Sequence, residues 1–184
     1  VTGERTALNF LQTLSGTATV TRRYVAALSG STTRVLDTRK TLPGLRAAQK
    51  YAVRCGGGEN HRFGLADEVM IKDNHLAALD GDIAKAVALA HEASPELKIE
   101  VEADTVEQAR AAAEAGADIV LLDNMSCDQI REAIELIDGR SETEASGGVT
   151  LETVSEIAGT GVNFISVGAL THSVRALDIS LDLK

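Results

Sequence analysis

A group of basic side chains is the feature of this sequence most able to do chemistry. Arg39 and Lys40 stand side by side just after a short apolar run that ends in Asp37. Arg62 and Lys72 follow, each in a loop or at the end of a predicted strand. An arginine fork matches a carboxylate or phosphate, and a lysine adds a point charge. The group predicts a site for a small polyanionic ligand; the alternative is that each cation pairs with a nearby surface acid.

Two carboxylates end consecutive predicted strands. Glu102 and Asp123 could bind ribose hydroxyls, act as acid and base, or hold hydrated Mg²⁺. The alternative again pairs each acid with one of the cations. Glu100 is expected on the same face as Glu102 but deeper, where it would pair with Lys98 or Lys72 only if it is buried.

Two glycine-containing loops follow the last two predicted strands. The first spans residues 144–150 (Glu-Ala-Ser-Gly-Gly-Val-Thr) and the second spans residues 166–172 (Ser-Val-Gly-Ala-Leu-Thr-His). Free backbone N–H groups at the start of a helix bind anions, and paired phosphate loops after two late strands recur in α/β barrels. One such loop would equally serve tight packing, but two in succession predict a phosphate-binding site.

Strand and helix patterns alternate along most of the chain, which predicts parallel βα units. The predicted strands are residues 34–37, 68–72, 98–102, 118–123, 142–146 and 163–167. The predicted helices lie near residues 45–54, 83–93, 106–115, 127–137 and 151–158.

The two ends of the chain have patterns of their own. A helix is predicted from Glu4 to Leu14, where Gly16 stops it, and a second helix from about Thr19 to Leu28. The final run, residues 177–183, is expected either to add a strand or to leave the barrel.

Polar residues at the strand ends favour a barrel over an open doubly wound sheet. In a barrel they would all point into one mouth, where barrel enzymes keep their chemistry. The residues in question are Asp37, Lys72, Glu102, Asp123, Ser146 and Gly168. The 184 residues are fewer than the roughly 250 of an eight-unit barrel. We therefore predict an α/β fold: an incomplete parallel barrel of six to seven strands, preceded by helices.

Composition limits the classes of partner. Net charge of −9 and 3% aromatic content argue against nucleic acid. No apolar run approaches the roughly 20 residues that cross a bilayer, and no secretory signal is visible, so no membrane partner is expected. Cys55 and Cys127 are interpreted as reduced thiols in a cytoplasm. The start lacks an initiator Met, and we expect a domain of a longer chain.

Taken in order, these motifs resemble quinolinate phosphoribosyltransferase (nicotinate-nucleotide pyrophosphorylase, carboxylating). The motifs are residues 37–46 (DTRKTLPGLR), 57–62 (GGENHR), 71–75 (IKDNH), 100–102 (EVE), 122–125 (LDNM), 144–148 (EASGG) and 166–168 (SVG). The resemblance covers essentially the whole chain. It implies that residues 1–184 are the barrel domain of a cytoplasmic two-domain enzyme, whose largely N-terminal α/β sandwich domain is not in this chain.

The resemblance also implies a role for each site residue. Arg39, His61, Arg62 and Lys72 would hold the two carboxylates of quinolinate, with Thr38 also at the substrate. Lys40 would lie between quinolinate and the pyrophosphate of phosphoribosyl pyrophosphate. Glu102 and Asp123 would serve the ribose hydroxyls and Mg²⁺, the latter through water. Ser146, Gly147 and Gly148, with Val167, Gly168, Ala169 and His172, would cradle the 5′-phosphate.

The implied activity is transfer of phosphoribosyl to quinolinate with decarboxylation, in NAD biosynthesis. Lys40, Glu102 and Asp123 would be the catalytic residues, and Mg²⁺ the cofactor. The implied assembly is a homodimer in which the partner subunit completes the site, and Arg5 resembles the arginine that a partner contributes. Two alternatives stay open: a related transferase of molybdate-transport context acting on another acceptor, and a non-catalytic phosphometabolite-binding barrel.

Overall fold

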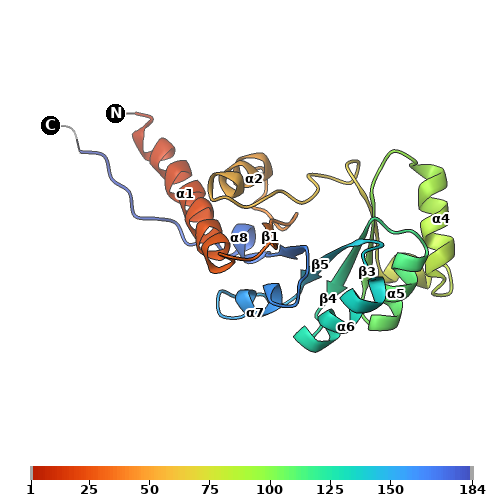
Figure 1. Cartoon of the computed structure of the whole chain (residues 1–184). Coiled ribbons are helices and arrows are strands. Elements are labelled where there is room, and N and C mark those ends of the chain that lie inside the picture. Colours follow the sequence, from red (N-terminus) through yellow and green to blue (C-terminus); the bar gives the residue numbers. More distant parts are fainter. Residues whose placement is uncertain (1, 183–184) are drawn as a thin grey trace.

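Six parallel strands form one sheet, in the order β1-β6-β5-β4-β3-β2, in the computed structural model, which describes residues 2–182. The strands are β1 (Arg34–Leu36), β2 (Val69–Ile71), β3 (Ile99–Ala103), β4 (Ile119–Asp123), β5 (Glu142–Ser146) and β6 (Phe164–Ser166). The helices are α1 (Glu4–Ala27), α2 (Arg46–Cys55), α3 (Asp73–Ala77), α4 (Ile83–Ala93), α5 (Val106–Glu114), α6 (Cys127–Ile137), α7 (Val154–Ala158) and α8 (Ala169–His172). Figure 1 shows α4, α5, α6 and α7 on the outer side of the sheet.

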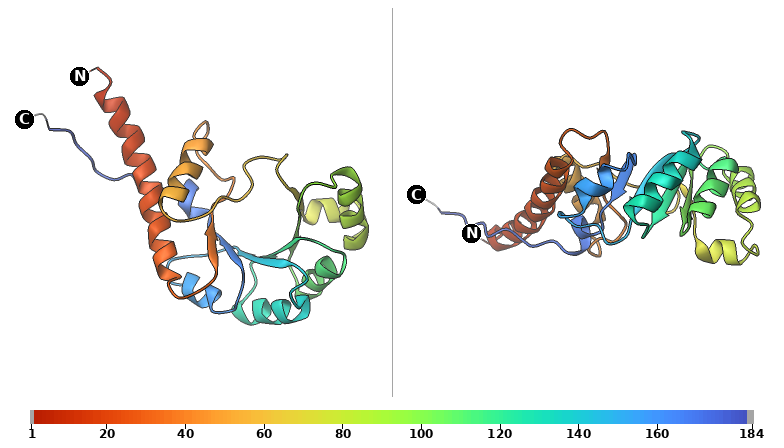
Figure 2. Two further views of the ribbon diagram at one scale, coloured as in Figure 1. Left: turned by 45° about the horizontal axis from the view of Figure 1, so that its top comes forward. Right: turned by 60° about the horizontal axis from the view of Figure 1, so that its bottom comes forward.

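The sheet curves into a barrel that does not close. In the left view of Figure 2 the strands and outer helices form an open ring whose two ends are β1 and β2. The edge of β1 is partly covered by the chain near Glu59, whose N–H donates to Val35 O at 2.8 Å and whose carbonyl accepts from Asp37 N at 3.2 Å. The predicted incomplete barrel is confirmed, with six strands and this bridge in place of a seventh.

Local sequence accounts for most elements. The six predicted strands and five predicted helices are all present, with ends that differ by a few residues at most. Side-chain caps fix three helix starts: Asp82 accepts from Lys85 N, and Thr105 accepts from Gln108 N. Ser126 and Gln129 form a reciprocal capping box at the start of α6.

Along β3 and β4, side chains that pack in the core alternate with side chains that face the cavity. Val101 on β3 and both Val120 and Leu122 on β4 have no exposed surface and belong to the hydrophobic core. The intervening residues face the other side of the sheet, and Glu102 and Asp123 among them line a cavity. Alanines on α5 that are fully buried, such as Ala109, let this helix pack closely on the sheet.

The prediction that Gly16 ends a helix was wrong. One helix, α1, runs through Gly16 from Glu4 to Ala27. A Cβ at position 16 would overlap the carbonyl oxygen of Arg175 and lie 2.9 Å from Val174 Cγ1. Glycine is therefore present because another segment crosses the helix there, and not because the helix stops.

The crossing segment leaves the barrel and follows α1. Gln12 O accepts from Leu177 N at 3.1 Å, and the Gln12 side-chain amide donates to Ile179 O at 3.0 Å. Residues 177–182 form no strand, and residue 183 of the predicted run lies outside the described residues. The first half of α1 and this segment extend side by side beyond the barrel (Figures 1 and 2). Within residues 2–182, no helix combines the length and apolarity that crossing a membrane requires.

Candidate functional site

The carboxyl ends of the strands surround a cavity of about 740 Å³. Most of the predicted site residues line it: Thr38, Arg39, Lys40, His61, Arg62, Lys72, Glu102, Asp123, Ser146, Gly147, Gly148, Gly168, Ala169 and His172. Arg5 lies far from it, near the free end of α1. Val167 does not line it either, because it is buried in the core and its N–H donates to Leu36 O at 3.0 Å.

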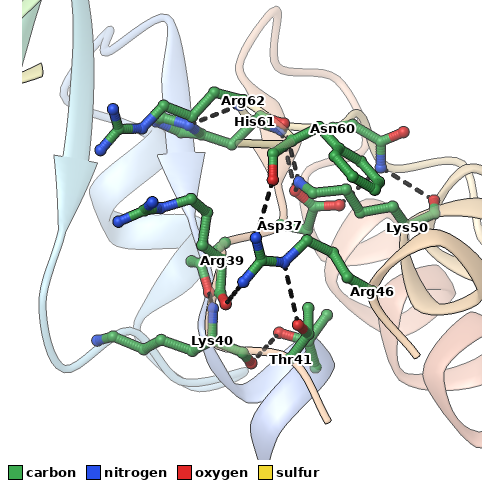
Figure 3. Close-up of polar contacts among 12 residues, drawn as sticks. Asp37, Arg39, Lys40, Thr41, Arg46, Lys50, Asn60, His61 and Arg62 are labelled. Atoms are coloured by element: carbon green, nitrogen blue, oxygen red, sulfur yellow. Dashed lines mark hydrogen bonds and ion pairs between the residues drawn. The ribbon is translucent and has the colours of Figure 1, made fainter. Parts of the chain in front are cut away.

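Four basic side chains, here called the rim cations, stand around the cavity: Arg39, Lys40, Arg62 and Lys72. Figure 3 shows Arg39, Lys40 and Arg62 pointing to one side of their loops, away from Asp37 and Lys50. Burial, together with the neighbouring Arg62 and Arg46 charges, lowers the pKa of Arg39. Like charges are thus held close together, an arrangement that an anionic ligand relieves.

Asp37 does not point into the mouth, and that prediction was wrong. Its carboxylate is completely buried and forms an ion pair with Lys50, which is 3% exposed. It also accepts from Asn60 Nδ2 at 2.6 Å and from His61 N at 2.9 Å. A buried carboxylate needs such partners, and these come from α2 and from the loop after it. Asp37 therefore anchors the loop that carries His61 and Arg62.

Arg46 ties the same loops together at the surface. Its guanidinium donates to Arg39 O at 3.1 Å, to Phe63 O at 3.0 Å and to Thr41 Oγ1 at 3.2 Å. The three contacts join the Arg46 side chain to two segments, the loop of Arg39 and Thr41 and the loop of Phe63 (Figure 3). Arg46 thus braces the loop on which Arg39 and Lys40 stand.

Lys72 and Glu102 form an ion pair across β2 and β3. The Lys72 side chain is 38% exposed and that of Glu102 16%, so both stay within reach of a ligand. The backbone N–H of Lys72 donates to His75 Nδ1 at 3.0 Å at the start of α3. His75, which has no visible partner in the sequence, therefore caps this short helix.

Asp123 is held by both of its carboxylate oxygens. Ser146 Oγ donates to Oδ1 at 2.5 Å, and Asn124 Nδ2 donates to Oδ2 at 2.7 Å. Asn124 N also donates to Ser146 O at 2.9 Å, which joins the ends of β4 and β5. Glu102 and Asp123 offer hard oxygen ligands with lone pairs to spare, so this donor set fits Mg²⁺ shared with substrate phosphates or water.

The glycines in the two loops are required by shape. Gly147 has φ +92°, and a Cβ there would overlap the side chain of Asn124. Gly148 has φ +60° with open space around it. A Cβ on Gly168 would lie 2.8 Å from His172 Nε2 and 3.6 Å from Lys40 Cδ. The Gly168 backbone, the His172 imidazole and the Lys40 side chain therefore lie close together at one side of the cavity.

A second group of titratable side chains, which we call the floor cluster, combines the predicted site residue His61 with three acids that the sequence analysis did not assign to the site: Glu68, Glu100 and Glu144. His61 Nε2 lies 3.2 Å from Glu100 Oε2 and 3.5 Å from Glu144 Oε2. Arg62 N donates to His61 Nδ1 at 2.8 Å, which leaves Nε2 as the ring nitrogen that faces the two carboxylates. Glu100 is indeed deeper than Glu102, as expected, but it faces a histidine rather than a lysine.

Burial controls the charges of the floor cluster. Desolvation and the nearby Glu100 charge raise the pKa of Glu144 to about 8. Desolvation and Glu100 likewise raise the pKa of Glu68 to about 7. Burial alone would lower the pKa of His61, but Glu100 and Glu144 outweigh it and raise that pKa to about 9. Burial acts to raise the pKa of Glu100, yet His61 prevails and lowers it.

Sequence reasoning left several cavity residues unassigned. They are Met70, Leu121, Asn124, Glu144, Val149, Thr150 and Ser166. Strand alternation was the available signal for two of them, because Glu144 stands two residues before Ser146 and Leu121 two before Asp123. The contacts of Asn124 with Asp123 and Ser146 had no comparable signal in the sequence.

The chain is similar over its length to proteins of one family. The model for "Quinolinate phosphoribosyl transferase, C-terminal domain" matches residues 17–182. A "Probable nicotinate-nucleotide pyrophosphorylase [carboxylating]" of Bacillus subtilis is 53% identical over 184 residues, covering 100% of this chain and 63% of the relative. The nicotinate-nucleotide pyrophosphorylase [carboxylating] of Mycobacterium leprae is 52% identical over 186 residues, covering 100% of this chain and 65% of the relative.

A solved structure of a related protein has the same fold. The nicotinate-nucleotide pyrophosphorylase structure from Francisella tularensis superposes with a TM-score of 0.94 at 50% identity, covering 97% of this chain and 64% of that one. The chain thus spans less than two thirds of the length of these relatives.

Proposed function

This chain belongs to the quinolinate phosphoribosyltransferase family, and from that premise we propose that the protein transfers phosphoribosyl to quinolinate with loss of CO2. The products are nicotinate mononucleotide, pyrophosphate and CO2, within NAD biosynthesis. One observation carries the proposal: four rim cations and two strand-end carboxylates line a single cavity. A dianionic acceptor and a pyrophosphate-bearing sugar need that combination.

The rim cations supply the acceptor clamp. Arg39 and Arg62 point to the same side of their loops and offer forks for carboxylates (Figure 3). Lys72 adds a charge on release from Glu102, and His61 closes the clamp from below. Two carboxylates on quinolinate balance this cation count better than a monocarboxylate does.

Lys40 stands at the boundary between acceptor and leaving group. It is exposed and lies beside the Gly168 loop, which we assign with Ser146, Gly147 and Gly148 to the 5′-phosphate. As the pyridine nitrogen attacks C1 of the ribose, negative charge grows on the departing pyrophosphate, where Lys40 stabilises it. Thr38 and His172 line the same cavity and add polar contacts.

Glu102 and Asp123 serve the sugar and the metal. Their carboxylates orient ribose hydroxyls and balance the positive charge that builds on the ribose in the transition state. Bound Mg²⁺ supplies charge neutralisation on the pyrophosphate, and Glu102 and Asp123 would hold it. The contacts from Ser146 and Asn124 keep Asp123 in position for this task.

Acids at the site argue against a pure phosphate-binding module. Simple anion binding gains nothing from Glu102 and Asp123 beside the anion, whereas transfer chemistry uses them. Decarboxylation then follows because the positive charge of the quaternary ring nitrogen stabilises the electron pair that stays on the adjacent ring carbon when CO2 departs. Such a reaction depends on positioning more than on a strong nucleophile.

The proposed assembly is a homodimer of two-domain subunits. Arg5 lies on the part of α1 that extends beyond the barrel, so it is available to a neighbouring subunit (Figures 1 and 2). Phe10 and Leu11 on the same part of the helix are 49% and 50% exposed, as expected of surfaces that an assembly covers. We assign an N-terminal α/β sandwich domain to the length by which the relatives exceed this chain.

The test uses full-length protein and quinolinate labelled in the carboxyl group that departs. Labelled CO2, pyrophosphate and nicotinate mononucleotide should appear in equal amounts, and only with both phosphoribosyl pyrophosphate and Mg²⁺ present. Replacing quinolinate by nicotinate, which lacks one carboxylate, should abolish turnover. An intact dimer that produces none of the three products would remove the proposal.

A further inference from the structure

Decarboxylation leaves an electron pair on a ring carbon, and a proton must arrive there to complete the product. The arginines of the rim cations keep their protons at any physiological pH. In the proposed function Lys72 faces a carboxylate of quinolinate and Lys40 faces the leaving pyrophosphate, so both ammonium groups are already engaged. The proton is therefore better sought among weak acids at the bottom of the cavity.

Glu144 is such an acid. It is 1% exposed, yet it contributes to the cavity wall, whereas Glu68 and Glu100 do not. Its Oε1 is buried and has no hydrogen-bond partner among the described residues. An unpartnered buried carboxyl oxygen at the wall of a substrate cavity is costly unless the group is neutral or meets a ligand.

The geometry around His61 favours a proton on Glu144 over a proton on Glu100. Nε2 of His61 faces two buried carboxylates, and the shorter distance is to Glu100, 3.2 Å against 3.5 Å for Glu144. The imidazole therefore favours negative charge on the nearer carboxylate, Glu100, more than on Glu144. Among the described residues, three carboxyl groups, Glu68, Glu100 and Glu144, face only His61 and the nearby Arg62 charge, so the cluster holds at least one proton. Glu144 is farther from His61 Nε2 than Glu100 is, and it is the one that lines the cavity.

We propose that Glu144, as a neutral carboxylic acid, donates the proton that replaces CO2 on the ring. This inference rests on the proposed function. The bond from ring carbon to carboxylate breaks, and its electron pair stays on the carbon beside the quaternary nitrogen. That pair takes the Glu144 proton to form the new C–H bond, and the electrons of the O–H bond remain as the Glu144 carboxylate. A proton from solvent restores the acid after product leaves.

The protonated form also suits substrate binding. A carboxylate in the cavity wall would repel a dianionic acceptor, while a carboxylic acid does not. The same side chain thus admits the acceptor and later supplies the proton. His61 is a positioning residue here, because it draws the negative charge of the cluster to Glu100.

The test separates the two halves of the reaction in the intact dimer. Glu144→Gln keeps the size and polarity of the side chain but cannot donate an acidic proton. In single-turnover quench experiments, its pyrophosphate formation should stay within about threefold of wild type, while nicotinate mononucleotide formation falls at least about 100-fold. Glu144→Asp, which keeps the acid, should recover part of that loss.

The matched control is Glu142→Gln, the same change two residues earlier on β5. Glu142 is 38% exposed and pairs with Lys98 and Arg34 away from the cavity, so both half-reactions should match wild type. Thermal unfolding of all variants checks folding. If Glu144→Gln does not fold, Glu144→Asp must still slow product formation more than pyrophosphate formation.

Several outcomes overturn the inference. Equal rates of wild type and Glu144→Gln in both steps would do so, and so would an equal loss in both steps, which marks a purely structural role. A tightly bound stoichiometric divalent cation that is lost in Glu100→Gln would also do so, because His61, Glu68 and Glu100 present ligand atoms within 4.8 Å of one another. Failure of wild type to release CO2 would instead sink the proposed function itself.

Discussion

The rim cations and the floor cluster belong to one cavity but treat charge in opposite ways. At the rim, Arg39, Lys40 and Arg62 keep their charges close together and open to a ligand. In the floor, burial and the Glu100 charge raise the pKa values of Glu68 and Glu144, which favours their neutral forms. Exposed rim cations therefore keep their charge and can bind a ligand, whereas burial shifts the pKa of the floor carboxyl groups toward the neutral form.

Neighbouring positions on one strand show the same difference. On β3, Glu102 pairs with Lys72 at the rim, and Glu100 two residues earlier is fully buried against His61. On β5, Ser146 reaches the Asp123 carboxylate, while Glu144 is one step deeper. A shift of two residues along a strand thus moves a side chain on the same face from a binding surface into a low-dielectric interior.

Removing one rim charge gives the largest expected effect. Lys40→Ala should lower kcat/KM by about 10²–10³, because it deletes a charge placed to stabilise the leaving group. Lys98→Ala is the control, since Lys98 pairs with Glu142 at the opposite end of the strands and should change kcat/KM less than twofold. A loss below tenfold for Lys40→Ala in steady-state kinetics would contradict the role given to Lys40.

A second rim change tests which ligand each cation serves. Arg62→Ala should weaken quinolinate binding by about 10–100-fold, the range for a lost charge-assisted contact, and phosphoribosyl pyrophosphate binding by less than about threefold. Titration calorimetry with each ligand measures both. Equal losses would show that the rim cations form one undivided anion site.

The loop beside the rim is expected to be sensitive to shape rather than charge. Gly147→Ala should lower the free energy of unfolding by about 1–3 kcal/mol, because φ is +92° and the new methyl meets Asn124. Gly148→Ala, with φ +60° and open space, carries strain alone and should cost less. Urea denaturation compares the two, and a larger cost at Gly148 would argue against the Asn124 contact.

The smallest expected effect concerns the floor cluster and pH. Folding raises the pKa of Glu144 from its ordinary 4.5 to about 8, so between these values the folded state holds a proton that the unfolded state releases. Stability from this group is complete below pH 4.5 and declines as pH rises toward 8. Glu144→Gln should flatten that decline by on the order of 1–2 kcal/mol.

Denaturation of Glu144→Gln, Glu142→Gln and wild type at pH 5 and pH 8 measures this difference. Glu142→Gln should keep the wild-type slope, because Glu142 is partly exposed. A slope in Glu144→Gln as steep as that of wild type would show that Glu144 is already ionised in the folded protein.

Much of the fold was predictable because its signals are local. Apolar runs and the strand–helix alternation predicted all six strands and the open barrel, and the structure adds local caps at Asp82 and Thr105. The error at Gly16 has a non-local cause, since the residue is small to admit the segment at Val174 and Arg175. No pattern within α1 distinguishes that reason from a helix end.

The sequence by itself determined the chemistry of the rim. Residues that end parallel strands or follow them must gather at one edge, so the cations, Glu102 and Asp123 could be placed together from their positions alone. Only the tertiary structure decided which charged groups serve the fold and which face a ligand. Asp37 became an anchor through Lys50, and burial together with the Glu100 charge raised the pKa of Glu144. Charge states depend on burial and on distances across the barrel, and neither is written in the spacing of residues along one strand.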